Sequence, residues 1–204
     1  MTVHRAISIN ELCMKKLKII PFEDNWLRSF GEPERSGAWI IWGNSGNGKT
    51  YFALQLCKYL TKFGRIAYNS LEEGCSQSMK LAFIKINMIE VRRKLILLDR
   101  EPINELKERL KRRQSPNIIA IDTIQYSGMN YKDYKELRYD FPKKLFILIS
   151  HAEGKEPAGR VAKSIKFDAS VKIRCEGYKA FPVSRSGGSE PFIIWNEGAG
   201  KYWG

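Results

Sequence analysis

Short apolar runs alternate along the chain with longer amphipathic stretches. Runs rich in apolar residues occupy residues 38–42, 65–70, 95–98, 117–121 and 144–149. Continuous apolar runs of this length are typical of strands in a parallel sheet that is covered on both faces. The pattern therefore predicts five buried strands.

Helix-like stretches separate these runs, at residues 51–60, 76–93 and 102–113. In the last of them, Ile103, Leu106 and Leu110 form an apolar stripe, so its many lysines and arginines belong to a solvated helix face rather than to a nucleic-acid patch. Strands that alternate with helices of this length indicate βαβ units with right-handed crossovers. The predicted fold class is α/β, with a mostly parallel central sheet flanked by helices.

Both ends of the chain depart from this alternation. From about residue 169, three strands joined by turns at Glu176-Gly177 and at residues 186–189 predict a C-terminal antiparallel extension. Residues 1–37 mix polar, basic and aromatic residues and end in a loop signal at residues 31–37. We therefore expect an N-terminal appendage over 1–37, a candidate subunit-contact segment, and the folded core over 38–204.

Composition narrows the class of partner. The chain has 204 residues, of which 43% are hydrophobic, which suits one globular domain of generous size. Lys and Arg number 35 against 22 Asp and Glu, a formal net charge of +13. Such an excess favours an anionic partner, nucleic acid first and an anionic membrane surface second, although a merely basic enzyme remains an alternative.

Cysteine and histidine usage argues against two further classes. Cys13, Cys57, Cys75 and Cys175 are scattered without a C-x-x-C pair, and the chain has 2 histidines. Neither a zinc site nor a disulfide framework is expected. There is no signal-peptide pattern and no apolar run of membrane-spanning length, so we expect a cytoplasmic protein with no membrane partner.

The most informative motif is a complete G-x-x-x-x-G-K-T sequence between the first strand and the first helix. Glycines in this setting let backbone N–H groups turn towards phosphates, and the following helix presents its positive N-terminus to them. The alternative, a glycine-rich turn without a ligand, does not require every position to be filled. The predicted nucleotide-binding residues are Gly43, Asn44, Ser45, Gly46, Asn47, Gly48, Lys49, Thr50 and Tyr51.

The motif also predicts the cofactors. Lys49 would reach the β- and γ-phosphate oxygens of ATP, and the Thr50 hydroxyl would ligate Mg²⁺. Asp122 ends an apolar strand and would hold the same ion through its water shell, because ligands bind at the carboxyl ends of strands in such folds. A carboxylate that only caps a turn is the alternative for Asp122.

Two further strand ends supply catalytic candidates. Glu72 and Glu73 follow the second strand, where a carboxylate can polarise the water that attacks the γ-phosphate. His151 ends another strand and can sense the γ-phosphate by hydrogen bonding, with an ordinary turn histidine as the alternative.

These segments, in their order along the chain, resemble the RecA superfamily. Within it they are most similar to the bacterial RadA/Sms recombination family, and more distantly to the DnaB and KaiC families. The family patterns V-S-x-E-E-S and P-D-L-V-V-I-D-S-I-Q look like residues 69–74 and 116–125. Its H-V-T-K-E-G-x-I-A-G-P and V-D-T-V-L-Y-F-E-G look like residues 151–160 and 167–177, and the stretch covered is about 38 to 195.

The resemblance implies a RecA-type core that assembles into rings or filaments, hydrolyses ATP between subunits and acts on single-stranded DNA in recombination, repair or replication. It implies that Arg185, which keeps only the arginine of the family's K-x-R, reaches the γ-phosphate of a neighbouring subunit. It also implies that the loop after His151 contacts DNA, where cations would meet phosphates. Those cations are Lys155, Arg160, Lys163 and Lys166.

The RadA/Sms family has a zinc module before the core and a protease-like domain after it, and from these 204 residues we expect neither. The chain looks like a core-only version, as in phage- and mobile-element-encoded recombinases. Two alternatives stay open: a KaiC-like regulatory ATPase with a protein partner, and an assembly protein that uses ATP without binding DNA. ATP hydrolysis measured with and without single-stranded DNA separates the three.

Overall fold

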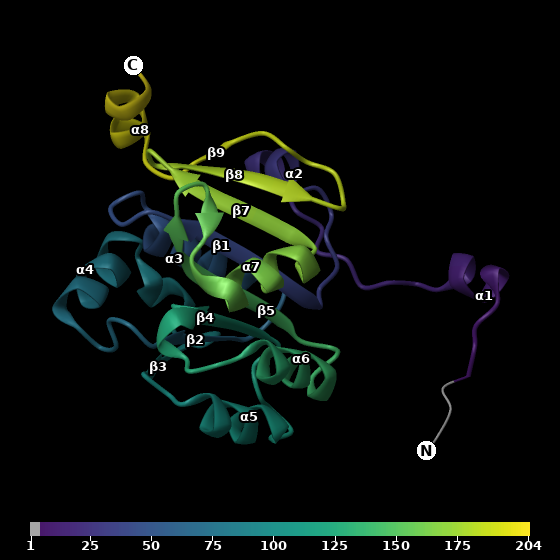
Figure 1. Cartoon of the computed structure of the whole chain (residues 1–204). Helices are drawn as coiled ribbons and strands as arrows, with labels where there is room; N and C mark the ends of the chain where they lie inside the picture. The colour runs from purple at the N-terminus through teal and green to yellow at the C-terminus, as the bar shows by residue number, and fades with distance from the viewer. Residues whose placement is uncertain (1–4) are drawn as a thin grey trace.

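The computed structural model describes residues 5–204, and its centre is one twisted sheet (Figure 1). The strand order is β3-β2-β4-β5-β1-β7-β8-β9, with β6 paired to β5. All pairings from β3 to β7 along this order are parallel, and β8 and β9 are added antiparallel. The strands are β1 (Gly37–Gly43), β2 (Ile66–Ser70), β3 (Leu95–Asp99), β4 (Ile118–Asp122), β5 (Leu145–Glu153), β6 (Glu156–Pro157), β7 (Val171–Glu176), β8 (Lys179–Ser184) and β9 (Phe192–Ile193).

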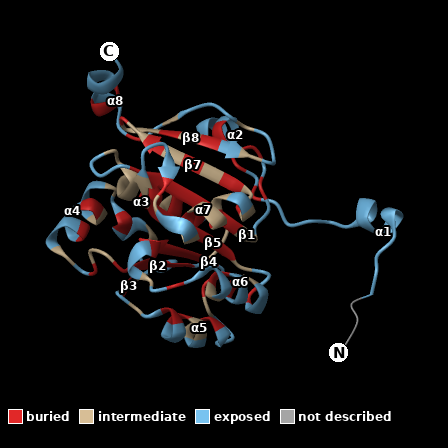
Figure 2. Ribbon diagram, in the orientation of Figure 1, coloured by how far each residue is buried: buried red, intermediate tan, exposed pale blue. Residues whose placement is uncertain are grey.

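Helices cover both faces of the sheet, as the apolar runs predicted. One core contains residues of α2 (Asp24–Phe30), α3 (Lys49–Leu60) and α4 (Gln77–Lys85). The other contains residues of α5 (Ile103–Lys111), α6 (Tyr131–Asp140) and α7 (Gly159–Asp168). Strands β2 and β4 are buried along their whole length between these layers (Figure 2). The α/β fold with its mostly parallel sheet is therefore confirmed.

One expectation about the elements was wrong in detail. The helix expected over 76–93 is broken, because Asn87 adopts a left-handed conformation with φ 54° between α4 and the short 3-10 helix η1 (Met88–Val91). The three strands expected after residue 169 are β7, β8 and β9, which pair antiparallel with one another, and β7 also pairs parallel with β1, which joins this extension to the main sheet. A second 3-10 helix, η2 (Ile124–Tyr126), and the C-terminal helix α8 (Asn196–Trp203) complete the fold.

The N-terminal region divides into two parts. Residues 5–19 are exposed and include α1 (Ile9–Met14), which projects from the body (Figure 1). Ile20, Phe22 and Phe30, in contrast, are buried in the same core as Trp39 and Phe52. The packed core thus reaches N-terminally beyond residue 38, where the sequence placed its start; residues 1–4 of the expected appendage lie outside the described residues.

The strand directions decide where a ligand can bind. Strands β1, β2, β4 and β5 are parallel, so Gly43, Ser70, Asp122 and Ser150 all lie near one edge of the sheet. The segments that follow these positions carry the chemical groups singled out in the sequence. Within residues 5–204, no helix combines the length and the apolar character needed to cross a membrane.

Candidate functional site: a phosphate-binding cavity

The glycine-rich loop joins β1 to α3 and is held by the neighbouring hairpin. The Asn47 side-chain oxygen accepts a hydrogen bond from the Gly177 N–H at 2.7 Å. A Cβ on Gly43 would lie 2.2 Å from the Cys175 carbonyl oxygen, so only glycine fits where the loop leaves the strand. Gly48 has φ 86° and caps α3, whose N-terminus faces the loop. The loop therefore has the backbone of an anion-binding nest.

Lys49 and Thr50 open α3 and line a cavity of about 490 Å³. The Lys49 ammonium donates to the Asn44 carbonyl oxygen at 3.0 Å, so it lies over the loop. Burial lowers the pKa of Lys49, while the negative charges of Asp122 and Glu72 act in the opposite direction. A cation held in a cavity with nearby carboxylates is arranged to receive phosphate oxygens.

Asp122 ends β4 and is only 6% exposed. Its Oδ2 accepts a hydrogen bond from the hydroxyl of Tyr68, a fully buried residue of β2, at 2.5 Å. Burial raises the pKa of Asp122 to about 6; the charges of Glu72 and Glu73 raise it further, whereas the Tyr68 hydrogen bond and Lys49 lower it. Among the described residues, no lysine or arginine forms an ion pair with Asp122. The carboxylate therefore lacks a direct cationic partner of its own.

Glu72 and His151 meet in the same cavity. Glu72 Oε2 lies 3.2 Å from His151 Nε2 and accepts a hydrogen bond from the Thr123 hydroxyl at 3.2 Å. Thr123 Oγ1 also lies 3.4 Å from His151 Nε2. The three side chains come from three different strand ends, and together they form a polar cluster where a water molecule could be held and polarised.

Glu73 lines the cavity but faces the other way. Its Oε2 accepts hydrogen bonds from the hydroxyls of Ser76 (3.4 Å) and Ser78, at the start of α4. These contacts direct its carboxylate towards α4, whereas Glu72 faces Thr123 and His151. The geometry thus places the two neighbouring glutamates in different surroundings.

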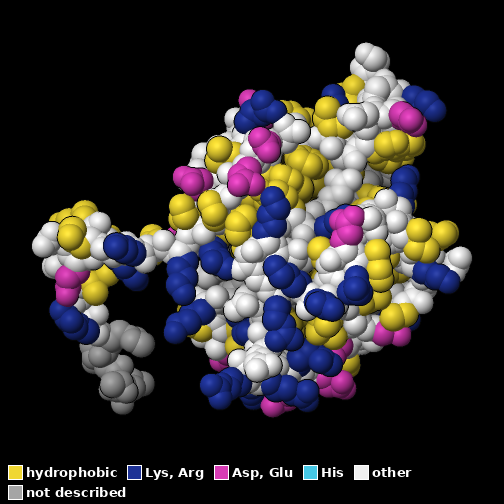
Figure 3. Space-filling model, turned by 180° about the vertical axis from the view of Figure 1, so that it is seen from behind, with side chains coloured by type: hydrophobic (Ala, Val, Ile, Leu, Met, Phe, Trp, Pro, Cys, Tyr) yellow, Lys and Arg dark blue, Asp and Glu magenta, His cyan; other side chains and the backbone are white. Residues whose placement is uncertain are grey.

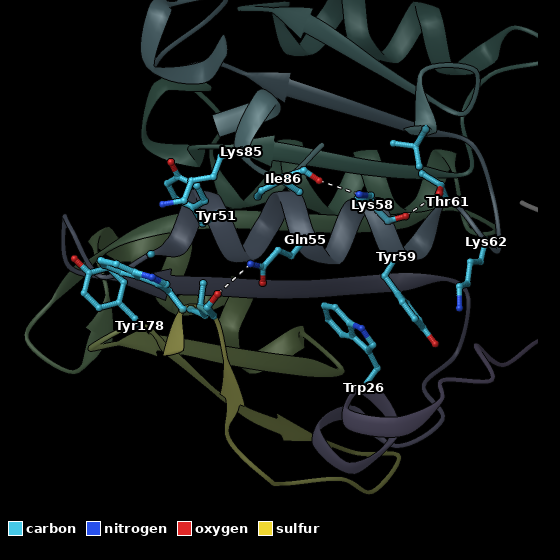
Figure 4. A pocket seen from close by; sticks show the side chains of 14 residues that line it. Trp26, Tyr51, Gln55, Lys58, Tyr59, Thr61, Lys62, Lys85, Ile86 and Tyr178 are labelled. Carbon is cyan, nitrogen blue, oxygen red and sulfur yellow. Dashed lines mark hydrogen bonds between the residues drawn. The ribbon is translucent and has the colours of Figure 1, made fainter. Parts of the chain in front are cut away.

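A larger hollow of about 830 Å³ adjoins the phosphate-binding cavity (Figure 4). Both are lined by Gly48, Tyr51 and Tyr178, so they meet at the first turn of α3. The Lys85 ammonium lies 5.0 Å from the Tyr51 ring centroid and 5.2 Å from that of Trp195. The space beside the phosphate loop is therefore aromatic, with a cation at its rim.

Arg185 lies elsewhere. It follows β8 at the edge where β7 begins, and its side chain donates to the Phe167 carbonyl oxygen at 3.5 Å. The residue is exposed. The structure therefore does not bring Arg185 together with the cavity of its own subunit.

The four cations expected in a loop after His151 lie mainly on a helix. Lys155 belongs to the β5–β6 turn, but Arg160, Lys163 and Lys166 belong to α7. Lys163 pairs with Glu153 at 2.8 Å, and Lys166 pairs with Glu156 at 2.6 Å. The expectation of a loop that carries all four cations was wrong, because the segment folds into a hairpin and then α7. Two of the four cations are already paired with glutamates.

Sequence reasoning missed three residues of the site. Tyr68, Thr123 and Tyr178 contact or line the cavity, but no role was assigned to them. Thr123 carried a signal, since it directly follows Asp122 at a strand end. Tyr68 occupies an apolar position in a strand and Tyr178 a position in a turn, and neither position indicated a role at the site.

The donor set fits Mg²⁺ brought in with a nucleotide. Among residues 5–204, no group of three or more His, Cys, Asp or Glu side chains is placed to hold a metal ion alone. Mg²⁺ commonly takes one or two protein oxygens and completes its shell with phosphate oxygens and water. Thr50 and Asp122, which line one cavity with the phosphate loop, match that requirement.

A phosphate-binding loop, a buried carboxylate at the end of the adjacent-but-one strand and a polar cluster beside them define a P-loop ATPase. Residues 39–156, more than half of the chain, match the family described as "ATPase family associated with various cellular activities (AAA)". The chain belongs to this family. None of the curated proteins compared with the chain matches it at a significant level.

Solved structures share the whole fold. The flagellar accessory protein FlaH from Methanocaldococcus jannaschii superimposes with a TM-score of 0.59 at 20% identity, over 87% of this chain and 97% of FlaH. A KaiC-like protein from the hyperthermophilic archaeon Pyrococcus horikoshii OT3 gives a TM-score of 0.57 at 15% identity, over 86% of this chain and 94% of that one. At these identities the similarity establishes a RecA-like fold.

Proposed function

We propose that the protein hydrolyses Mg²⁺-ATP with Glu72 as the carboxylate that activates the attacking water. The observation that carries this proposal is the cluster of Glu72, Thr123 and His151 opposite Lys49 in one cavity. Thr123 and His151 fix the position of the Glu72 carboxylate, and His151 is also placed to sense the γ-phosphate. Removing the charge of Glu72 should therefore abolish turnover without abolishing binding.

The nucleotide itself is proposed to span the two cavities. Its phosphates lie on the loop of residues 43–50, with Lys49 on their β and γ oxygens and Mg²⁺ held through Thr50 and the water shell of Asp122. Its base lies beside Tyr51 and Tyr178, where the two cavities meet. Aromatic faces at that position suit a purine ring.

The test compares two neighbouring glutamates. Glu72→Gln should bind ATP as the parent does while turnover falls roughly 10²–10⁴-fold, the usual contribution of a general base. Glu73→Gln is the matched control, because the same charge is lost one residue away at a side chain bonded to Ser76 and Ser78. Normal turnover by Glu72→Gln together with a strong loss in Glu73→Gln would reverse the two roles.

We further propose that subunits assemble so that Arg185 acts on a neighbour's nucleotide. Its position, remote from its own phosphate loop and exposed, supports a role across an interface. Mixing Arg185→Ala with Lys49→Ala subunits should restore part of the activity, since some mixed interfaces then contain one intact site. Absence of rescue in proteins shown to co-assemble would contradict the trans role.

For the substrate, we propose single-stranded DNA in recombination, repair or replication, in keeping with the ordered RadA/Sms-like motifs. Stimulation of ATP hydrolysis by single-stranded DNA is the deciding measurement. One observation favours the second candidate, a KaiC-like regulatory ATPase: Lys163 and Lys166, two of the four proposed DNA contacts, are already paired with glutamates. A parent protein that hydrolyses ATP but neither binds nor responds to DNA would support that candidate.

A further inference from the structure

Basic residues precede every one of the first five strands. Arg35 precedes β1, Arg65 precedes β2, Lys94 precedes β3 and Lys144 precedes β5. Further arginines and lysines extend these positions, namely Arg92 and Arg93 before β3, Arg112 and Arg113 before β4, and Lys143 before β5. Because the five strands are parallel, these cations lie at one edge of the sheet, opposite the edge that holds the phosphate loop. We call this set, with Lys15, Lys16 and Lys18, the basic edge.

Backbone hydrogen bonds join the segments of the basic edge to one another. The Ile66 N–H donates to the Lys94 carbonyl oxygen at 2.8 Å, and the Asn117 N–H donates to that of Arg65 at 2.9 Å. The Gly37 N–H donates to the carbonyl oxygen of Lys144 at 3.0 Å, and the Arg35 N–H donates to that of Lys18 at 2.8 Å. The basic edge is therefore one continuous surface, from β3 across to the base of the N-terminal arm.

The charge of this surface is not neutralised within the chain. Among residues 5–204, none of the cations of the basic edge forms an ion pair with a carboxylate. Arg35 and Arg65 donate to the carbonyl oxygens of Phe63 and Gln114, which orders them but leaves their charge in place. Figure 3 shows lysine and arginine side chains gathered between the arm and the lower half of the body. This contrasts with α7, where Lys163 and Lys166 are paired.

The surface is also concave beside the arm. A hollow of about 670 Å³ lies there, and the cations that line it are Lys15, Lys16, Lys18, Arg35 and Lys143. Leu17 and Pro142 are its apolar lining residues, and Glu34 is its carboxylate. A hollow lined by five cations and two apolar residues suits a chain of phosphates lying in it better than it suits the flat surface of a membrane.

We propose that the basic edge binds the sugar–phosphate backbone of a nucleic acid strand. This goes beyond the proposed function, which places DNA at the segment after His151 and at the nucleotide edge. A strand of five residues spans roughly 17 Å, so polymer and ATP would occupy opposite edges and bind without competing. Contacts of this kind position a strand and carry no sequence information, so binding is expected to be sequence-tolerant.

The experiment measures binding of a fluorescent mixed-sequence single-stranded oligonucleotide at several salt concentrations. The edge variant replaces five cations with glutamine at positions for which the structure gives no side-chain hydrogen bond: Arg93, Lys94, Arg112, Arg113 and Lys143. We expect affinity at 0.1 M salt to fall roughly 10²–10³-fold and the log–log salt slope to flatten by about 0.7 for each phosphate that is no longer neutralised. ATP binding should be unchanged, since these side chains lie at the other edge.

A charge-matched control separates location from net charge. It replaces five cations elsewhere with glutamine: Arg28, Lys80, Lys132, Lys135 and Lys201. This variant should keep most of the parent's affinity; a loss as large as that of the edge variant would overturn the proposal.

Two further arms separate this proposal from its rivals. A variant with Lys155, Arg160, Lys163 and Lys166 replaced by glutamine tests the segment after His151. If this variant loses DNA binding while the edge variant keeps it, the basic edge is not the DNA-binding site, and the segment after His151 remains the proposed site.

Sedimentation with phosphatidylserine-containing vesicles tests whether the basic edge binds a membrane instead. Vesicle binding that depends on the basic edge, without DNA binding, would overturn the proposal in favour of a lipid surface. Unchanged Glu72-dependent hydrolysis in the edge variant, measured without DNA, shows that the ATPase assignment stands apart from this result.

Discussion

Two tyrosine–aspartate pairs, one on each face of the sheet, share the same hydrogen bond and differ in charge balance. Tyr68 donates to Asp122 Oδ2 at 2.5 Å, and Tyr134 donates to Asp168 Oδ2 at 2.5 Å. Both tyrosines are fully buried, one in each core. Asp168, however, also accepts from Arg138 at 2.6 Å, whereas Asp122 has no such cation.

The missing arginine changes what the carboxylate can do. Burial raises the pKa of Asp168, but the hydrogen bond from Tyr134 and the charge of Arg138 outweigh it, so the pKa falls below its usual value. Burial raises the pKa of Asp122 to about 6 despite its tyrosine. Asp168 is thus a completed structural ion pair, while Asp122 keeps an unbalanced charge that a divalent cation can use. The aspartate is therefore neutralised by an arginine in one pair and has no such partner in the other.

The largest expected effect is on turnover. Asp122→Asn should lower the rate of Mg²⁺-dependent ATP hydrolysis by roughly 10³-fold, because a metal ion's charge stabilisation contributes several kcal/mol and would lose its anchor. Asp168→Asn is the matched change in the pair of Tyr134 and Asp168. It should leave the rate per folded molecule within about twofold of the parent, because the Asp168 carboxylate lies outside the phosphate-binding cavity. The two rates are compared at saturating ATP. Equal losses would show that the two carboxylates do not differ in function.

A smaller effect is expected from the tyrosines. Tyr68→Phe keeps the ring in the core but removes the hydrogen bond that orients Asp122, and loss of such partners commonly costs 10–100-fold in metal affinity. The Mg²⁺ concentration that half-saturates Mg²⁺-dependent nucleotide binding should therefore rise by roughly that factor. Tyr134→Phe removes the equivalent bond from Asp168 and should leave this concentration unchanged. A similar shift in both variants would indicate a general loss of packing.

The smallest expected effect is on stability, and its sign differs between the pairs. The pKa of Asp122 is raised, so the folded state holds its proton more tightly than the unfolded state, and stability is lost as pH rises from about 4 through about 6. Asp122→Asn should therefore stabilise the nucleotide-free protein at pH 7, by about 1 to 2 kcal/mol, and much less at pH 4.

For Asp168 the pKa is lowered, so its stabilisation is present above its ordinary pKa and is lost as pH falls below it. Asp168→Asn should destabilise by about 1 kcal/mol at pH 7, a modest value because the pair is partly exposed and screened. Urea unfolding of both variants at pH 4 and pH 7 tests the opposite slopes. Parallel slopes would contradict the contrast.

The sequence was enough to predict the strands and the site residues that a local pattern marks. The apolar runs predicted five strands at the right places, although β3, at the edge of the sheet, is only partly buried and not buried as expected. Strand ends predicted that Asp122, Glu72 and His151 would lie at one edge. The partners of these residues could not be predicted in the same way. Tyr68 meets Asp122 because β2 pairs with β4 in the register that places Ser70 opposite Asp122, and that register is a property of the assembled sheet.

Other differences have the same origin. The break at Asn87 and the parallel pairing of β7 with β1 depend on packing between distant segments, which short-range periodicity does not record. The pairing of Lys163 and Lys166 with glutamates depends on the β5–β6 hairpin, which brings Glu153 and Glu156 towards α7. Arg65, Lys94 and Lys144 of the basic edge, in contrast, stand directly before strands and could be located once the strands were known.

The hairpin of β7 and β8 has a mechanical consequence. At one end, its turn is fastened to the phosphate loop by the bond between Gly177 and Asn47. At the other end, β8 leads into Arg185, roughly 20 Å away at the rise of an extended strand. Strand β8 is hydrogen-bonded to β7 along its whole length, so no flexible joint separates the two ends. It is therefore a rigid connection, held in the sheet by the pairing of β7 with β1, between the phosphate loop and the segment that carries Arg185. In an assembly where Arg185 faces the next subunit, as proposed above, one ordered strand would join the nucleotide of each subunit to the arginine presented to its neighbour.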